Sequence, residues 1–273
     1  MNKRGYFSND NSQTYFRPDN YRSFGLKYEK KQVSVLNTGL LTAGLGFLYV
    51  ALIGFLFEYL VFLPVLNGDT SSFGSGWSIA LICASVGIIV GSIMSLIWSF
   101  RVYKASSTFA LITIAIYTTA SGIGLGALFA IIELLYQNGL GLIMSAFGLI
   151  AAIFLGSYLI TKLISFKFSL TLTKIVMVAS IVGSLLFIGM LIASFAITSL
   201  YAYRVLWIAM SAISIVLGII FLVYNLWIAQ SMDRLYMENE LSKKMGLFIG
   251  FQILSNMIML LFAILRIIAL SKR

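Results

Sequence analysis

The chain has 273 residues, of which 60% are hydrophobic and only 10% charged, and its mean hydropathy is +0.99. Soluble domains are about 45–50% apolar and about 25% charged, so this composition excludes an ordinary water-soluble fold. The net charge is +10, histidine is absent and Cys83 is the only cysteine, which excludes a disulfide framework, a cysteine metal cluster, HExxH zinc proteases and Ser-His hydrolases.

Residues 1–32 form a polar tail with seven basic and three acidic side chains. The apolar run that follows, at 33–57, is too long for the hydrophobic region of a signal peptide, so we expect it to be the first transmembrane span. We interpret the tail as a cytoplasmic segment whose cationic flank fixes the orientation of that span, and we expect no nucleic-acid partner.

A loop rich in Gly, Ser and Asp (67–76) separates the first apolar run from six more. Each run has 22 to 27 residues and almost no charge, which is enough to cross a bilayer as a helix. The sequence therefore predicts an all-α integral membrane protein with one seven-helix domain over 33–273. The later spans are expected at about 77–100, 108–132, 140–161, 173–199, 205–229 and 246–270.

The basic residues predict the orientation. Fifteen of the nineteen Lys and Arg residues lie in the tail or in the connections after spans two, four and six. The positive-inside rule places those segments in the cytoplasm, so the N-terminus is expected inside and the C-terminus outside.

No acidic side chain is expected in the middle of a span. Glu58 and Glu133 fall near the outer ends of spans one and three, and Asp233 falls just past the inner end of span six. An intramembrane aspartyl protease needs two acids facing each other inside the membrane, so we expect no enzyme of that class. No catalytic residue, metal site or cofactor is predicted.

Small residues in the third span predict close helix packing. Thr118, Thr119, Gly122 and Gly126 form a stripe at helical spacing, which lets a neighbouring backbone approach. No strand precedes these glycines, so they do not indicate a nucleotide-binding loop. The pair Gly246 and Gly250 repeats the pattern.

Polar stripes mark one face of each of the last two spans. They suggest either hydrogen bonds between helices or a polar path for an ion or a proton. Amide oxygens without a carboxylate would bind a hard cation weakly, which suits a leak better than a binding site. The stripe of span six comprises Ser211, Ser214, Gly218, Asn225, Ala229 and Asp233, and that of span seven Gln252, Asn256, Met259, Ala263 and Arg266.

The segment 231–244 between these spans is expected to be a solvated connecting helix, with Glu240 and Lys244 spaced for an i,i+4 ion pair. A cytoplasmic gate or a docking element for a partner is the alternative.

The chain resembles the Bax-inhibitor (transmembrane Bax-inhibitor-motif) superfamily, in particular its bacterial branch. The resemblance rests on the seven-span layout, the motif at 120–127 (ASGIGLGA) followed by Glu133, Asn225-Leu226, and the closing 264–268 (ILRII). It implies six helices around a central seventh, a pH-sensitive calcium leak in the bacterial plasma membrane, and roles in modulating membrane proteases.

In the better-studied relatives, a pair of aspartates on spans six and seven shares protons and senses pH. The corresponding positions here are near Ala229 and at Asn256, and Asp233 lies one turn beyond Ala229. The resemblance therefore implies a cation leak, or a regulator of membrane homeostasis, without this dyad. Two alternatives stay open: a non-conducting scaffold for a membrane protease or another membrane complex, and a small-solute transporter.

Overall fold

The computed structural model describes residues 33–66, 106–163, 166–196, 199–233 and 239–271, together with positions 78, 79, 82, 89, 90 and 93. All of them belong to one compact unit, Val33–Arg273. The expected tail and most of the expected second span lie outside the described residues.

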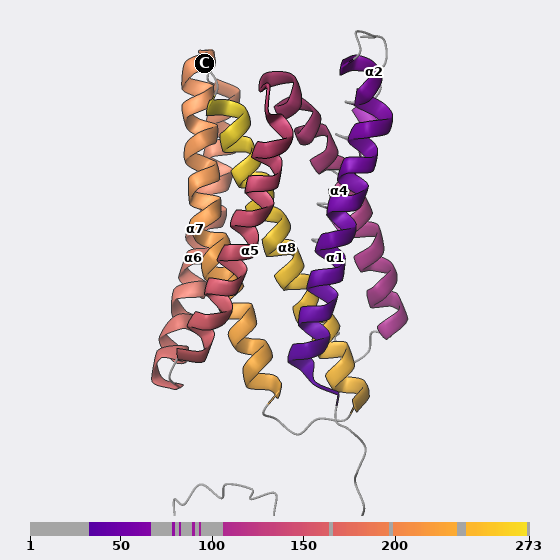
Figure 1. The fold of residues 1–273 in the computed structure, drawn as a ribbon. Coiled ribbons are helices and arrows are strands. Elements are labelled where there is room, and N and C mark those ends of the chain that lie inside the picture. The colour runs from indigo at the N-terminus through magenta and orange to yellow at the C-terminus, as the bar shows by residue number, and fades with distance from the viewer. Residues whose placement is uncertain are drawn as a thin grey trace, which may run out of the picture. The chain divides into compact units, whose positions relative to one another are not determined.

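Every regular element in these ranges is a helix (Figure 1). The first transmembrane segment changes from α-helix to π-helix and back to α-helix. The elements are α1 (Val35–Phe57), η2 (Glu58–Phe62), α2 (Leu63–Leu66), α4 (Ser107–Leu135), α5 (Gly139–Leu163), α6 (Phe166–Ala196), α7 (Leu200–Asp233) and α8 (Asn239–Ser271).

Two serines define where helices begin. The Ser34 hydroxyl accepts a hydrogen bond from the Asn37 N–H at 3.0 Å, and Ser106 does the same for Phe109 at 3.1 Å. Both hydroxyls satisfy an N–H that has no partner inside its own helix. The helices extend beyond most of the apolar runs that predict them, because apolarity marks only the part in contact with hydrocarbon.

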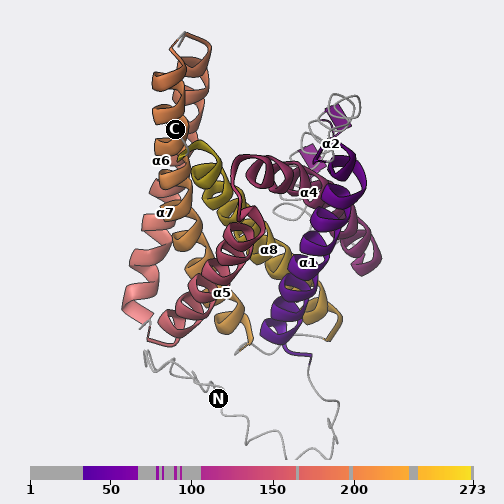
Figure 2. The ribbon, with the colours of Figure 1, turned by 45° about the horizontal axis from the view of Figure 1, so that its top comes forward.

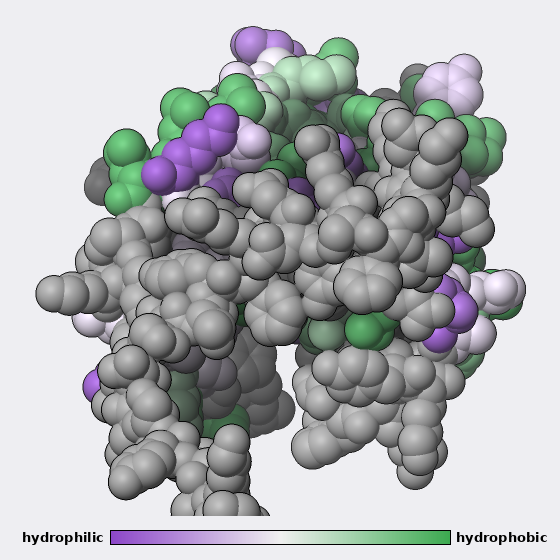
Figure 3. All heavy atoms as spheres, turned by 90° about the horizontal axis from the view of Figure 1, so that it is seen from below, coloured by the Kyte–Doolittle hydropathy of each residue, from purple (hydrophilic) through white to green (hydrophobic). Residues whose placement is uncertain are grey.

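Five described segments are long and apolar enough to cross a membrane: Val35–Leu60, Ser107–Leu135, Gly139–Leu163, Tyr201–Asp233 and Asn239–Ser271. In α6 the described apolar stretch is shorter, Thr171–Gly183. Large hydrophobic side chains such as Leu48 (67% exposed) lie on the outer surface, and hydrophobic residues are prominent on the coloured part of Figure 3. Such a surface suits lipid rather than water, so the fold is that of a helical membrane protein.

The core of the unit surrounds α8. Figures 1 and 2 show this helix, in yellow, running obliquely between α1 and α7. It packs against α1, α4, α5 and α7, whereas α6 packs mainly against α7. Four of the six helices expected around a central last span are therefore seen in contact with it.

Candidate functional site

The two polar stripes face each other across the interface of α7 and α8. At Gly218 of α7, an added Cβ atom would lie 2.8 Å from the side chain of Leu260 and 3.3 Å from that of Met259 on α8. Near the C-terminal end of α8, the Arg266 guanidinium lies over the Trp207 ring, 4.8 Å from its centroid. Both contacts join the faces on which the stripes lie.

The antiparallel register brings three amides to nearby levels. Pairing Gly218 with Met259 places Asn225 level with Gln252, and Asn256 lies one helical turn further along α8. Asn225 is only 7% exposed, and the other two amides are partly buried. The interface thus contains a group of three amides, Asn225, Gln252 and Asn256, which we call the amide cluster.

No hydrogen bond joins these three side chains to one another within the part of the chain that the structure describes. Buried polar groups usually have a partner, because an unpaired amide in apolar surroundings costs about 1–3 kcal/mol. The amide cluster therefore retains donors and acceptors that a water molecule or an ion can engage. This distinguishes it from a set of side chains that only joins helices.

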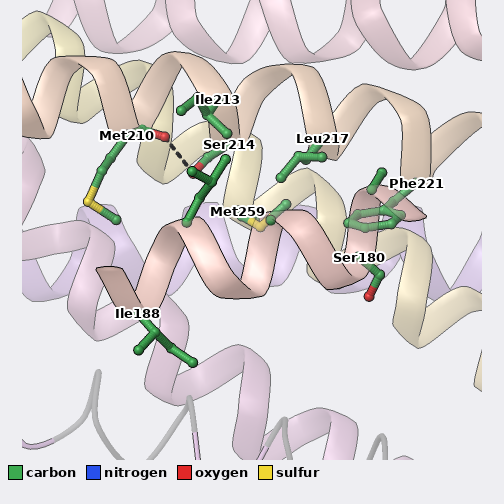
Figure 4. A pocket seen from close by; sticks show the side chains of 11 residues that line it. Ser180, Ile188, Met210, Ile213, Ser214, Leu217, Phe221 and Met259 are labelled. Atoms are coloured by element: carbon green, nitrogen blue, oxygen red, sulfur yellow. Dashed lines mark hydrogen bonds between the residues drawn. The ribbon is translucent and has the colours of Figure 1, made fainter. Parts of the chain in front are cut away.

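A cavity of about 400 Å³ lies beside this interface, between α6, α7 and α8 (Figure 4). Ser180, Ser214, Leu217, Phe221 and Met259 are among its lining residues. The Ser214 hydroxyl donates to the Met210 carbonyl at 2.9 Å, so its proton is already engaged. The lining is mostly apolar, which suits an acyl chain better than an ion.

Asp233 lies at the start of α1. Its Oδ1 accepts a hydrogen bond from the Val35 N–H at 2.8 Å, and Asn239 Oδ1 accepts one from the Val33 N–H at 3.1 Å. The register of α7 and α8 separates Asp233 from the level of Asn256 by twelve residues, or roughly 18 Å at 1.5 Å per residue. Asp233 therefore accepts a hydrogen bond from the N-terminus of α1 and lies far from the amide cluster.

The predicted connection at 231–244 is only partly described, because residues 234–238 lie outside the described ranges. Helix α7 ends at Asp233, and α8 already begins at Asn239. The predicted ion pair is confirmed, since Lys244 Nζ lies 2.9 Å from Glu240 Oε1. Both residues belong to the first turns of α8.

Arg266 is held by aromatic residues of α7. Besides the contact with Trp207, the Tyr203 ring lies 5.8 Å from the Trp207 ring. A cation over an indole face is stabilised by about 1–2 kcal/mol where water is excluded. Arg266 therefore contributes to the packing of the two helices.

The glycines of the third-span stripe lie against α1. An added Cβ at Gly126 would meet the Gly54 carbonyl oxygen at 2.5 Å, and one at Gly122 would meet the Val50 carbonyl oxygen at 3.0 Å. At Gly250 of α8 it would lie 2.7 Å from the Gly39 carbonyl oxygen. These are contacts between backbones, and they leave no room for a side chain.

The sequence does not predict a polar contact that joins α4 to α8. The Tyr117 hydroxyl of α4 lies 3.0 Å from the Ser255 hydroxyl of α8, and the Tyr117 ring packs edge-on against Phe251. Neither residue belongs to a polar stripe. Only the parallel register of α4 and α8 identifies the pair.

The described residues contain no group of three or more His, Cys, Asp or Glu that could hold a metal ion. Neither the protein-family models nor the curated proteins include a match to this chain. The fold and the interface thus define a class, a helical membrane protein whose last two helices enclose unpaired amides, without assigning it to a family.

Proposed function

We propose that this chain is a Bax-inhibitor-like membrane protein that lets cations, calcium among them, leak slowly along the interface of α7 and α8. The observation that carries the proposal is the amide cluster, whose polar groups are not paired with one another at the interface of α7 and α8. The proposal includes the expected placement in a bacterial plasma membrane with the N-terminus inside.

Physical chemistry supports a leak rather than storage of the ion. Amide carbonyl oxygens are acceptable ligands for a hard cation, but tight calcium sites use carboxylates. The stripes of α7 and α8 carry no acid at the level of the amide cluster, because Asp233 caps α1. A cation in this interface would be bound weakly and released quickly, as conduction requires.

The first test is ion entry into sealed liposomes that contain the purified full-length protein. Calcium entry is read with an internal dye at pH 6 and pH 8, and monovalent cation entry is read in parallel. We expect entry above that of empty liposomes and a reduction of several-fold in Asn225→Leu and Asn256→Leu. Ser145→Ala, on an exposed position of α5, is the matched control. Entry equal to that of empty liposomes at both pH values would favour the scaffold alternative.

Water access to the amide cluster provides an independent test. In a Cys83→Ser background, single cysteines at positions 225, 252 and 256 should react with a small, water-soluble thiol reagent in liposomes. A cysteine at Leu48, on the lipid-facing surface, should not react. Three unreactive positions in a folded protein would contradict a hydrated path.

A further inference from the structure

Glu58 is a buried carboxyl group that neither the polar stripes nor the amide cluster explains. It is the first residue of η2, where the helix of the first span changes from α to π. The side chain is 6% exposed, and its Oε1 atom is buried without a hydrogen-bond partner. Widened π-turns occur often at functional sites, and an unpaired buried acid needs a physical explanation.

The side chain of Glu58 belongs to the face of α1 that packs against α4. It lies one turn after Gly54, where an added Cβ would lie 2.8 Å from the Phe129 ring of α4, and whose carbonyl lies against Gly126. The next turn of α4 carries Glu133, which is partly buried and close enough to Glu58 for the two carboxyl groups to interact electrostatically. The close packing of glycines thus brings two acids together at one end of the α1–α4 pair.

No positive side chain of the described residues neutralises this pair. Glu58 is the only charged residue from Val35 to Leu66, and Glu133 is the only one in α4. On α8, Arg266 lies over Trp207, while α7 meets the start of α1 through Asp233 at the opposite end. The nearby start of α5, at Gly139, packs against the backbone of Glu133, and the only charged residue of α5 is Lys162 in its last turn.

Two tyrosines follow these acids closely in the sequence, but a phenol carries no positive charge that could neutralise the pair. Tyr59 is 63% exposed, and the Tyr136 hydroxyl donates to the Ile268 carbonyl at 2.7 Å. Two ionised carboxylates in this apolar setting would repel each other, and the buried one would lose its hydration. Among the described residues nothing offsets this repulsion, so we look to a bound positive charge.

We propose that Glu58 and Glu133 form a proton-binding site that holds one proton at neutral pH. A proton fits this site better than a metal ion, because the surroundings are apolar and a metal would need six to eight oxygens where the pair supplies at most four. The step is a simple acid–base equilibrium in which a hydronium ion gives its proton to one carboxylate and leaves as water. Glu133, which is partly exposed, connects the buried oxygen with the aqueous phase.

Loss of the proton would place two negative charges at the point where η2 meets α4. Repulsion would then favour separation of η2 and α2 from the end of α4. The site is thus a pH-sensitive contact that is separate from the amide cluster, and it does not depend on the leak proposed above.

Infrared spectroscopy of the full-length protein in a maltoside detergent tests the site, because that detergent contains no carbonyl group. The C=O stretching band of a protonated carboxyl should be present at pH 7 in the wild type. It should be absent in Glu58→Gln, and in Glu133→Gln it should disappear at a lower pH than in the wild type. Glu240→Gln, which alters an exposed acid paired with Lys244, is the control and should keep the wild-type band.

Three results would overturn the proposal. The first is a folded wild type without the band at pH 7, a measurement that needs no variant and so is independent of any folding defect in Glu58→Gln. The second is a band that persists unchanged in Glu58→Gln. The third is a wild-type band that vanishes on adding calcium or sodium at constant pH, because a metal ion would then be the occupant.

Discussion

The two sides of α8 are built in different ways. On the α1 side, Gly246 and Gly250 lie against the backbone and Thr side chains of α1, and α4 approaches α1 equally closely through Gly126. On the α7 side, a single glycine, Gly218, provides the close approach, amides face one another without pairing, and a cavity lies next to the interface. The comparison indicates that close packing fixes one half of the bundle, whereas the other half has room for polar chemistry.

The largest effect on stability should come from adding a methyl group to the closely packed half of the bundle. In Gly126→Ala the new Cβ would lie 2.5 Å from a backbone oxygen of α1, which cannot rotate away. We expect a loss of stability of about 2 kcal/mol, in the range for overpacked sites. The thermal midpoint of the purified protein in detergent measures this loss. Gly148→Ala, where nothing lies within 4 Å of the new atom, should instead be neutral or stabilising by up to about 1 kcal/mol.

A second test removes the hydroxyl that joins α4 to α8. Tyr117→Phe leaves Ser255 without its partner in a partly buried setting, so we expect destabilisation by about 1.5 kcal/mol. The exposed Tyr49 hydroxyl, 3.3 Å from Thr119, is the matched comparison, and Tyr49→Phe should change the thermal midpoint very little. Equal effects of the two substitutions would mean that burial does not distinguish these contacts.

On the α7 side, Arg266→Gln should have a smaller effect. The substitution removes the cation over Trp207 and leaves the aliphatic part of the side chain in place, so about 1 kcal/mol should be lost. Arg266→Lys should retain part of the stability, because the charge remains. The quenching of Trp207 fluorescence in single-tryptophan variants reports the same contact. If the Gln variant is as stable as the wild type, the contact of Arg266 with Trp207 contributes nothing measurable to stability.

The smallest effect on stability is expected at the amide cluster. Asn225→Leu removes an unpaired amide and keeps a similar volume. The free energy of unfolding, obtained from the thermal midpoint, should therefore fall by less than about 0.5 kcal/mol or should rise. Cation entry into liposomes should nevertheless fall. A strong loss of stability in this variant would show that Asn225 holds the bundle together, and the contrast between the two sides of α8 would disappear.

The sequence predicts those features of this protein that depend on helical periodicity. Spacing alone selects Gly122 and Gly126 as packing residues and groups Asn225 with Gly218 and Gln252 with Met259, because a helix of known pitch determines which residues share a face. It also predicts the pairing of Glu240 with Lys244, which depends only on local helical geometry.

What spacing cannot supply is the register between helices. Which helix each glycine meets, the contact of Tyr117 with Ser255, and the position of Asp233 at the start of α1 all depend on how far one helix is shifted along another. The burial of Glu58 depends in addition on the change from α to π geometry at the end of α1, which the spacing of apolar and small residues does not predict. The seven-span count and the orientation remain predictions.

The hydrogen bonds at the start of α1 have a consequence for the order of assembly. The acceptors for the Val33 and Val35 N–H groups lie 206 and 198 residues further along the chain. At a synthesis rate of about 5–20 residues per second, the first helix would wait roughly 10 to 40 seconds before the ribosome has made its partners. During that interval its glycine face is in contact with lipid or with a helper protein. Helix α1 therefore completes its contacts only after α8 has been made.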